Sequence, residues 1–99
     1  MPFSKSVAIL ALCRALNVTH LVESGRMGGI SLLHYHAFGL RLTSIELNPL
    51  PQVAAALRRR MPLESDLRLL DGNGVRLVPR AVDELRRASP DARLSLIHI

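Results

Sequence analysis

The sequence predicts an α/β fold in which parallel strands are joined by crossover helices. Four segments with helical spacing of apolar residues alternate with four short strand-like segments along the 99 residues. Such alternation is typical of a parallel sheet, because each parallel connection must cross back over the sheet. Hydrophobic residues make up 48% of the chain and charged residues 21%, which excludes a disordered or low-complexity protein. A chain of this length is expected to form one domain.

The first half of the chain supplies two helices and two strands. We expect a helix over residues 4–16, where apolar residues recur at helical spacing, and a strand over residues 19–23 that ends in a glycine-rich turn. A second helix over residues 30–38 is stopped by Gly39, and a second strand over residues 41–47 is broken by Asn-Pro.

The second half repeats this order. The third helix, over residues 52–61, is rich in alanine and carries three arginines in its last turn, where cations complement the helix dipole. The third strand, over residues 66–70, is closed by Asp-Gly-Asn-Gly, a strong turn sequence. We expect a fourth helix over residues 75–88, with Pro79 in the first turn where proline is tolerated, and a fourth strand over residues 92–99.

The loop after the first predicted strand is a candidate binding site. Residues 23–31 read Glu-Ser-Gly-Arg-Met-Gly-Gly-Ile-Ser. Glycines let a backbone approach a ligand closely, and the helix that follows offers unpaired N–H groups at its start. In an alternating α/β chain such a loop is a common place for a nucleotide-like cofactor, although three glycines can also simply form a tight turn.

Glu46 is the second candidate, because it stands at the end of the second predicted strand. It follows Gly25 by about 20 residues, the separation expected for an acidic residue that binds ribose hydroxyls. A ribose diol supplies two donors to such a carboxylate. The alternative interpretation is a solvated glutamate at a strand end.

Two strings together resemble a known family. The Glu-x-Gly-x-x-x-Gly-x-Ser of residues 23–31 and the Ser-Ile-Glu-Leu-Asn-Pro of residues 44–49 are similar to the first and second motifs of class I S-adenosylmethionine-dependent methyltransferases. The resemblance is strongest to the catechol O-methyltransferase-like and cephalosporin-hydroxylase-like branches, and it extends over about residues 19–85. It implies a Rossmann-like parallel sheet and S-adenosylmethionine as the cofactor.

The resemblance also implies roles for individual residues. The two loop glycines would let the chain pass under the methionine part of the cofactor, Ser31 would bind its carboxylate, and Glu23 would orient the loop. Glu46 would bind the ribose, while the Asp-Gly-Asn segment after the third strand would border the adenine. The positions assigned to cofactor binding are Glu23, Gly25, Gly29, Ser31, Glu46, Asp71 and Asn73.

The chain is shorter than such an enzyme. Class I methyltransferases continue through a seven-stranded sheet, and their acceptor site and any metal ligands come from the fourth strand onward. We therefore expect residues 1–99 to be the N-terminal, cofactor-binding half of one domain, truncated after about four strands and inactive alone. Residues 94–99 are also similar to the translated end of a transposon adapter used for sequencing libraries, so they are either a non-native tail or a genuine fourth strand. The acceptor, the metal requirement and the catalytic base stay open.

Two other functions, an oxidoreductase and a nucleic-acid-binding module, fit the sequence less well. A nicotinamide-dependent oxidoreductase is disfavoured because glycines at 25, 28 and 29 do not form Gly-x-Gly-x-x-Gly. A basic nucleic-acid-binding module fits the net charge of +5, but the arginines are dispersed and lack interleaved aromatic residues.

No apolar run reaches the ~20 residues of a membrane span. The single cysteine fits a reducing cytoplasm, and His34 and His36, two apart on a helix, cannot readily share a metal ion.

Overall fold

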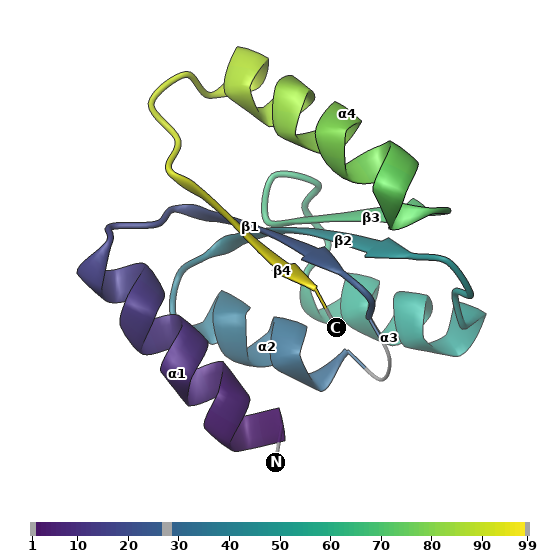
Figure 1. The fold of residues 1–99 in the computed structure, drawn as a ribbon. Helices are drawn as coiled ribbons and strands as arrows, with labels where there is room; N and C mark the ends of the chain where they lie inside the picture. Colours follow the sequence, from purple (N-terminus) through teal and green to yellow (C-terminus); the bar gives the residue numbers. More distant parts are fainter. Residues whose placement is uncertain (1, 27–28, 99) are drawn as a thin grey trace.

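The computed structural model describes residues 2–26 and 29–98, and the eight predicted elements occur in the predicted order (Figure 1). Each bound lies within two residues of its predicted position. The elements are α1 (Pro2–Ala15), β1 (His20–Ser24), α2 (Ile30–Ala37), β2 (Arg41–Glu46), α3 (Pro51–Arg60), β3 (Leu67–Asp71), α4 (Gly74–Ala88) and β4 (Leu94–His98).

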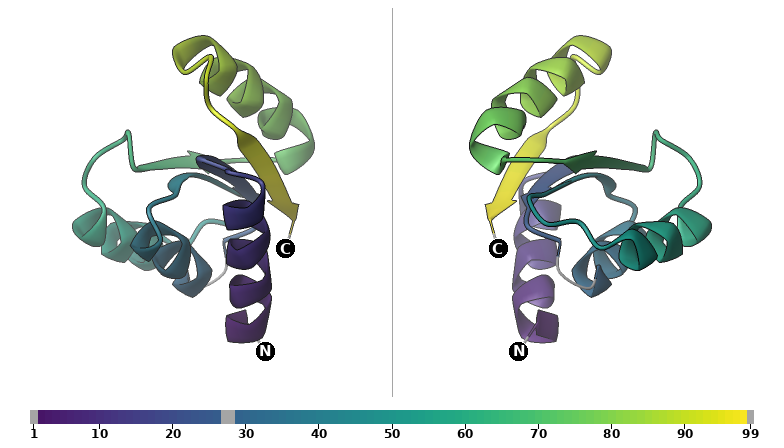
Figure 2. Two further views of the ribbon diagram at one scale, coloured as in Figure 1. Left: turned by 90° about the vertical axis from the view of Figure 1, so that its left-hand side faces the viewer. Right: turned by 90° about the vertical axis from the view of Figure 1, so that its right-hand side faces the viewer.

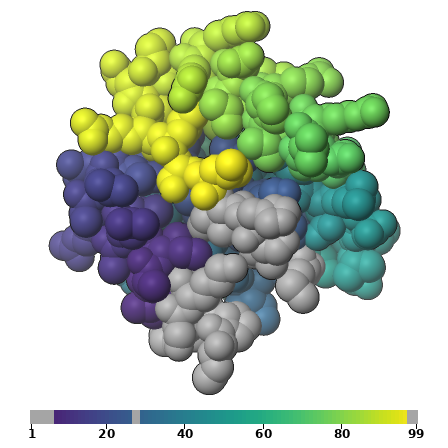
Figure 3. Space-filling view, viewed as in Figure 1, coloured from purple at the N-terminus to yellow at the C-terminus, as the bar shows by residue number. Residues whose placement is uncertain are grey.

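The four strands form one parallel sheet in the order β3-β2-β1-β4. The chain therefore moves outward from β1 to β3 and then returns to the other side of β1. Right-handed crossovers require α2 and α3 to cover one face of the sheet and α4 the opposite face. The ribbon shows this arrangement, with α1, α2 and α3 on one face of the sheet, α1 next to α2, and α4 alone on the opposite face (Figures 1 and 2). In the space-filling view the green residues of α4 likewise lie at the top of the molecule, and the purple, described part of α1 lies at the lower left (Figure 3).

Two hydrophobic clusters separate these layers. Adjacent strand residues point to opposite faces, so Leu21 belongs to the cluster under α1, α2 and α3, and Val22 to the cluster under α4. The buried members of the first cluster are Cys13, Leu21, Leu32, Tyr35, Leu40, Leu42, Leu57, Met61 and Leu67. Those of the second are Val22, Ile45 and Ala81, with partly buried Leu70, Leu77, Val78, Val82 and Leu85 packed against them. The sheet is thus covered on both faces, as parallel sheets usually are.

Pro79 departs from its predicted position in the first turn of α4. The helix begins at Gly74, so Pro79 lies inside it, in the second turn. Proline has no N–H, and the carbonyl of Val75, four residues earlier, therefore loses its helical partner. Val75 is 85% exposed, so this turn of α4 faces solvent. The described parts of the chain include no helix long and apolar enough to cross a membrane.

Candidate functional site

The carboxyl ends of three neighbouring strands meet at one edge of the sheet. Glu46 at the end of β2 is in register with Asp71 at the end of β3. The N–H of Gly25, just after β1, donates to the carbonyl of Ile45 at 2.8 Å, and the N–H of Gly72 donates to the carbonyl of Glu46 at 2.8 Å. The loops after β1 and β3 are thus both attached to β2. In open α/β sheets, ligands bind outside the carboxyl ends of the strands, near the point where the strand order reverses.

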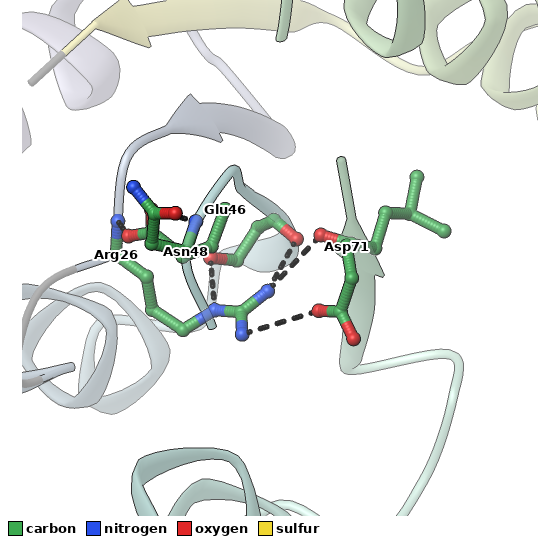
Figure 4. A network of polar contacts seen from close by, with 6 residues as sticks. Arg26, Glu46, Asn48 and Asp71 are labelled. Atoms are coloured by element: carbon green, nitrogen blue, oxygen red, sulfur yellow. Dashed lines mark hydrogen bonds and ion pairs between the residues drawn. The ribbon is translucent and has the colours of Figure 1, made fainter. Parts of the chain in front are cut away.

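The Glu46 carboxylate points toward the glycine-rich loop. Its Oε1 accepts the backbone N–H of Arg26 at 2.8 Å, and its Oε2 accepts the backbone N–H of Asn48 at 3.1 Å (Figure 4). The side chain is half-buried. A carboxylate held by one backbone N–H at each oxygen has a defined orientation.

The loop glycines adopt conformations that other residues rarely reach. Gly25 has φ 98° and Gly29 has φ 81°, both in the left-handed region. A Cβ at Gly29 would lie 3.0 Å from both Cδ atoms of Leu57 in α3, so this glycine also permits a close contact between the loop and the core. Met27 and Gly28, which belong to the same predicted loop, lie outside the described residues.

The start of α2 has the features of an anion site. Its N-cap is Gly29, which provides no side-chain hydrogen bond to the first N–H groups of the helix. Ser31 is the second residue of α2 and is half-buried. The backbone N–H groups and partial positive charge of a helix start attract carboxylates and phosphates.

The remaining predicted residues lie in different environments. Glu23 is only 1% exposed and sits beside Ser44 in register, on the sheet face covered by α1, α2 and α3. Asp71 is at the edge, with its side chain 64% exposed. Asn73 is the N-cap of α4, and its Oδ1 accepts the N–H of Val75 at 2.9 Å. The Asn73 side chain therefore has a capping function that is independent of any ligand.

Arg26 is part of this site, although sequence reasoning did not single it out. Its guanidinium lies across the ends of β2 and β3, where it contacts Ser44, the carbonyl of Leu70 and the carboxylate of Asp71 (Figure 4). From the sequence alone, an arginine in a glycine-rich loop is expected to be exposed to solvent. The Arg26 side chain is buried because the ends of β2 and β3, which are distant from it in sequence, pack against it.

The first residue of α4, on the other face of the sheet, lies against the end of β1. A Cβ at Gly74 would collide with Oγ of Ser24, the last residue of β1. The backbone of α4 therefore approaches the end of β1 directly. This contact places the turn after β3 next to the loop after β1.

Two hollows lie on other parts of the molecule, away from the carboxyl ends of β1, β2 and β3. A hollow of about 750 Å³ lies between α1 and α2, lined mainly by apolar residues such as Leu10, Cys13 and Phe38. Another, of about 440 Å³, lies at the amino ends of the strands near His20 and Arg41.

Burial, with a smaller contribution from the Arg41 guanidinium, lowers the pKa of His20, and burial raises the pKa of the Cys13 thiol. Within the described residues, no three His, Cys, Asp or Glu side chains are grouped closely enough to hold a metal ion.

The arrangement can be compared with known proteins. No protein-family model and no curated protein sequence matches the chain. Among solved structures, the fold is similar to that of a protein from Staphylococcus aureus assigned as a caffeoyl-CoA O-methyltransferase, with a TM-score of 0.65 and 24% sequence identity. The match covers 80% of this chain and 39% of that chain.

This similarity defines the fold class. The chain has a Rossmann-like α/β fold of the kind seen in that methyltransferase, and it spans well under half of the neighbour's length. The predicted α/β fold class, with a parallel sheet and crossover helices, is confirmed.

Proposed function

We propose that this chain is the cofactor-binding part of an S-adenosylmethionine-dependent methyltransferase. The orientation of Glu46 is the observation that carries the proposal, because its carboxylate faces the glycine-rich loop. The fold of the methyltransferase neighbour and the two sequence motifs support the same conclusion. The more specific catechol O-methyltransferase-like or cephalosporin-hydroxylase-like branch, and a location in the cytoplasm, belong to the proposal as well.

The residues at the strand ends fit the chemical groups of this cofactor. The start of α2 and Ser31 would hold its carboxylate, since this helix has no side-chain cap competing for its first N–H groups. Glu46 would accept hydrogen bonds from the ribose hydroxyls. Asp71, with its exposed carboxylate in register with Glu46, would lie beside the adenine.

Other residues of the site would act on the loop. Gly25 and Gly29 would let it pass close to the methionine part of the cofactor, as their positive φ angles allow. Glu23 would orient the loop from the buried face of β1. The family resemblance also implies a place beside the adenine for Asn73, whose side chain caps α4.

The cofactor supplies a methyl group on a sulfonium, which a nucleophile of the acceptor can attack directly. Such a transfer depends on holding the methyl carbon and the nucleophile in line more than on covalent help from the protein. We therefore assign binding and orientation to this chain. No catalytic base or metal ligand is assigned within it.

The test is binding of S-adenosylhomocysteine to the 99-residue chain, measured by titration calorimetry. We expect saturable binding that Glu46→Gln weakens by about tenfold to a hundredfold, the effect of losing one or two hydrogen bonds to a charged group. Glu64→Gln is the matched control, because Glu64 is an exposed carboxylate outside the site. It should leave the affinity unchanged.

Two outcomes would replace the proposal. Binding of NAD in preference to S-adenosylhomocysteine would indicate an oxidoreductase fragment. Binding of duplex DNA with steep salt dependence, and of neither cofactor, would indicate a basic nucleic-acid-binding module. Equal affinities of the Glu46→Gln and Glu64→Gln variants would contradict the assigned role of Glu46.

A further inference from the structure

Arg26 belongs to the glycine-rich loop, yet its side chain is only 1% exposed. Burying a guanidinium is costly unless polar partners replace water around it. The partners must therefore be built into the site. A solvent-exposed arginine on a surface loop needs no such partners, because water solvates its guanidinium.

The partners of the Arg26 guanidinium come from two strands. Its Nε–H donates to Oγ of Ser44 at 3.0 Å, and Nη2 donates to the carbonyls of Ser44 at 3.1 Å and Leu70 at 3.2 Å. Its Nη1 lies 3.6 Å from Oδ1 of Asp71 (Figure 4). The side chain consequently fastens the loop after β1 to the carboxyl ends of both β2 and β3.

The backbone of Arg26 is fixed at the same time. Its N–H donates to Oε1 of Glu46 at 2.8 Å, and its carbonyl accepts the N–H of Gly29 at 3.0 Å. Arg26 therefore contacts both carboxylates, because its backbone N–H binds Glu46 and its guanidinium lies beside Asp71. Loss of the guanidinium would release the contact with Asp71 and would leave the loop held by its backbone bonds alone.

We propose that Arg26 is a positioning residue for the nucleoside half of the cofactor, an inference that rests on the proposed function. Its guanidinium holds the loop, and through the loop and the strand ends it sets the directions of the Glu46 and Asp71 carboxylates. Arg26 acts through these two side chains. Arginine suits this role because its planar group can serve three acceptors in fixed directions, whereas lysine offers a single ammonium.

The experiment compares two arginines that both bind strand carbonyls. Arg58, the control, is half-buried, and its Nη1 donates to the carbonyl of Met61, just after α3, at 3.2 Å and to that of Leu67, at the start of β3, at 2.8 Å. Both contacts lie away from the carboxyl ends of the strands. We would measure binding of S-adenosylhomocysteine and of 5′-methylthioadenosine, which lacks the amino-acid end, to wild type, Arg26→Met, Arg26→Lys and Arg58→Met.

Both Arg26 variants should bind both ligands about tenfold or more weakly, because a Glu46 carboxylate that is no longer held in direction loses hydrogen bonds to the ribose. Arg58→Met should leave both affinities unchanged even if it lowers the melting temperature. In the free protein, the amides of Gly25 and Gly29 should exchange with solvent faster in Arg26→Met than in Arg58→Met. A role as a simple positive charge would instead be rescued by Arg26→Lys, and that result would overturn the inference.

The outcomes separate this inference from the proposed function. If the wild type binds neither ligand, the proposed function is wrong and the inference is wrong with it. If the wild type binds and Arg26→Met binds equally well, only the inference fails. Weakened S-adenosylhomocysteine binding with unchanged 5′-methylthioadenosine binding would also overturn it, because Arg26 would then act on the amino-acid half. Should Arg26→Met not fold, Ser44→Ala removes one acceptor alone, and unchanged affinities in that variant would be decisive against the inference.

Discussion

Replacing Gly29 with alanine should destabilise the protein more than the same change at Gly39. The two glycines have nearly the same φ angle, 81° and 83°, in the left-handed region. An L-residue in the left-handed region costs roughly 1–2 kcal/mol, and this cost applies at both positions. The reduced entropy of the unfolded chain that alanine brings also applies to both. A comparison of the two variants therefore cancels these contributions.

The surroundings of the two glycines differ. A Cβ at Gly29 would lie 3.0 Å from both Cδ atoms of Leu57 and 3.2 Å from its Cγ, whereas a Cβ at Gly39 would meet nothing within 4 Å. Leu57 is 3% exposed in the larger core cluster, so it has little room to move away. Overpacking of this kind costs about 1–3 kcal/mol. We expect a total loss of about 2–5 kcal/mol for Gly29→Ala and about 1–2 kcal/mol for Gly39→Ala.

Urea unfolding followed by circular dichroism gives both free energies of unfolding. The double variant Gly29→Ala with Leu57→Ala provides a second measurement, because the smaller side chain removes the contact. Its loss should be smaller than the sum of the two single losses by about 1 kcal/mol or more. Equal losses at Gly29 and Gly39, or strict additivity with Leu57→Ala, would refute the assignment of a steric contact at Gly29.

Two further changes test other parts of the fold. Asn73→Ala should lower the free energy of unfolding by about 1 kcal/mol through loss of the cap on α4, and Asn73→Ser should restore most of it; an unchanged midpoint in urea for the alanine variant would contradict this. Burial and Arg41 lower the pKa of His20, so the unfolded chain binds this proton more readily. Stability from His20 is therefore complete above about pH 6.5 and is lost as the pH falls through the lowered folded pKa. His20→Gln should flatten this dependence in urea titrations between about pH 5 and pH 8, and a parallel curve would show that His20 is not its source.

The order and bounds of the elements could be predicted from the sequence because local residues mark them. Glycine and Asn-Pro stops separate the segments, and the apolar spacing within each segment distinguishes helix from strand. The position of Glu46 followed from the same reasoning, since it stands where a strand ends. The sequence therefore predicts that Glu46 and the loop after β1 lie at the same edge of the sheet.

Other parts of the site depend on contacts that no local pattern records. The Arg26 side chain binds groups that lie 18 and 44 residues further along the chain, and these come together only when β2 and β3 pair. Its burial could not be predicted from a glycine-rich loop. The cap at Asn73 is different, because an asparagine before a helix is itself a recognised start signal. The family resemblance instead implies a ligand contact for this residue, because the turn after the third strand borders the adenine in that family.

The contact between Ser24 and Gly74 has a consequence for evolution. The Ser24 hydroxyl at the end of β1 occupies the space that a methyl group at Gly74, the beginning of α4, would need. Related sequences should therefore show covariation between them: a larger residue at the helix start is expected where the strand ends in alanine or glycine, or where the helix has shifted outward.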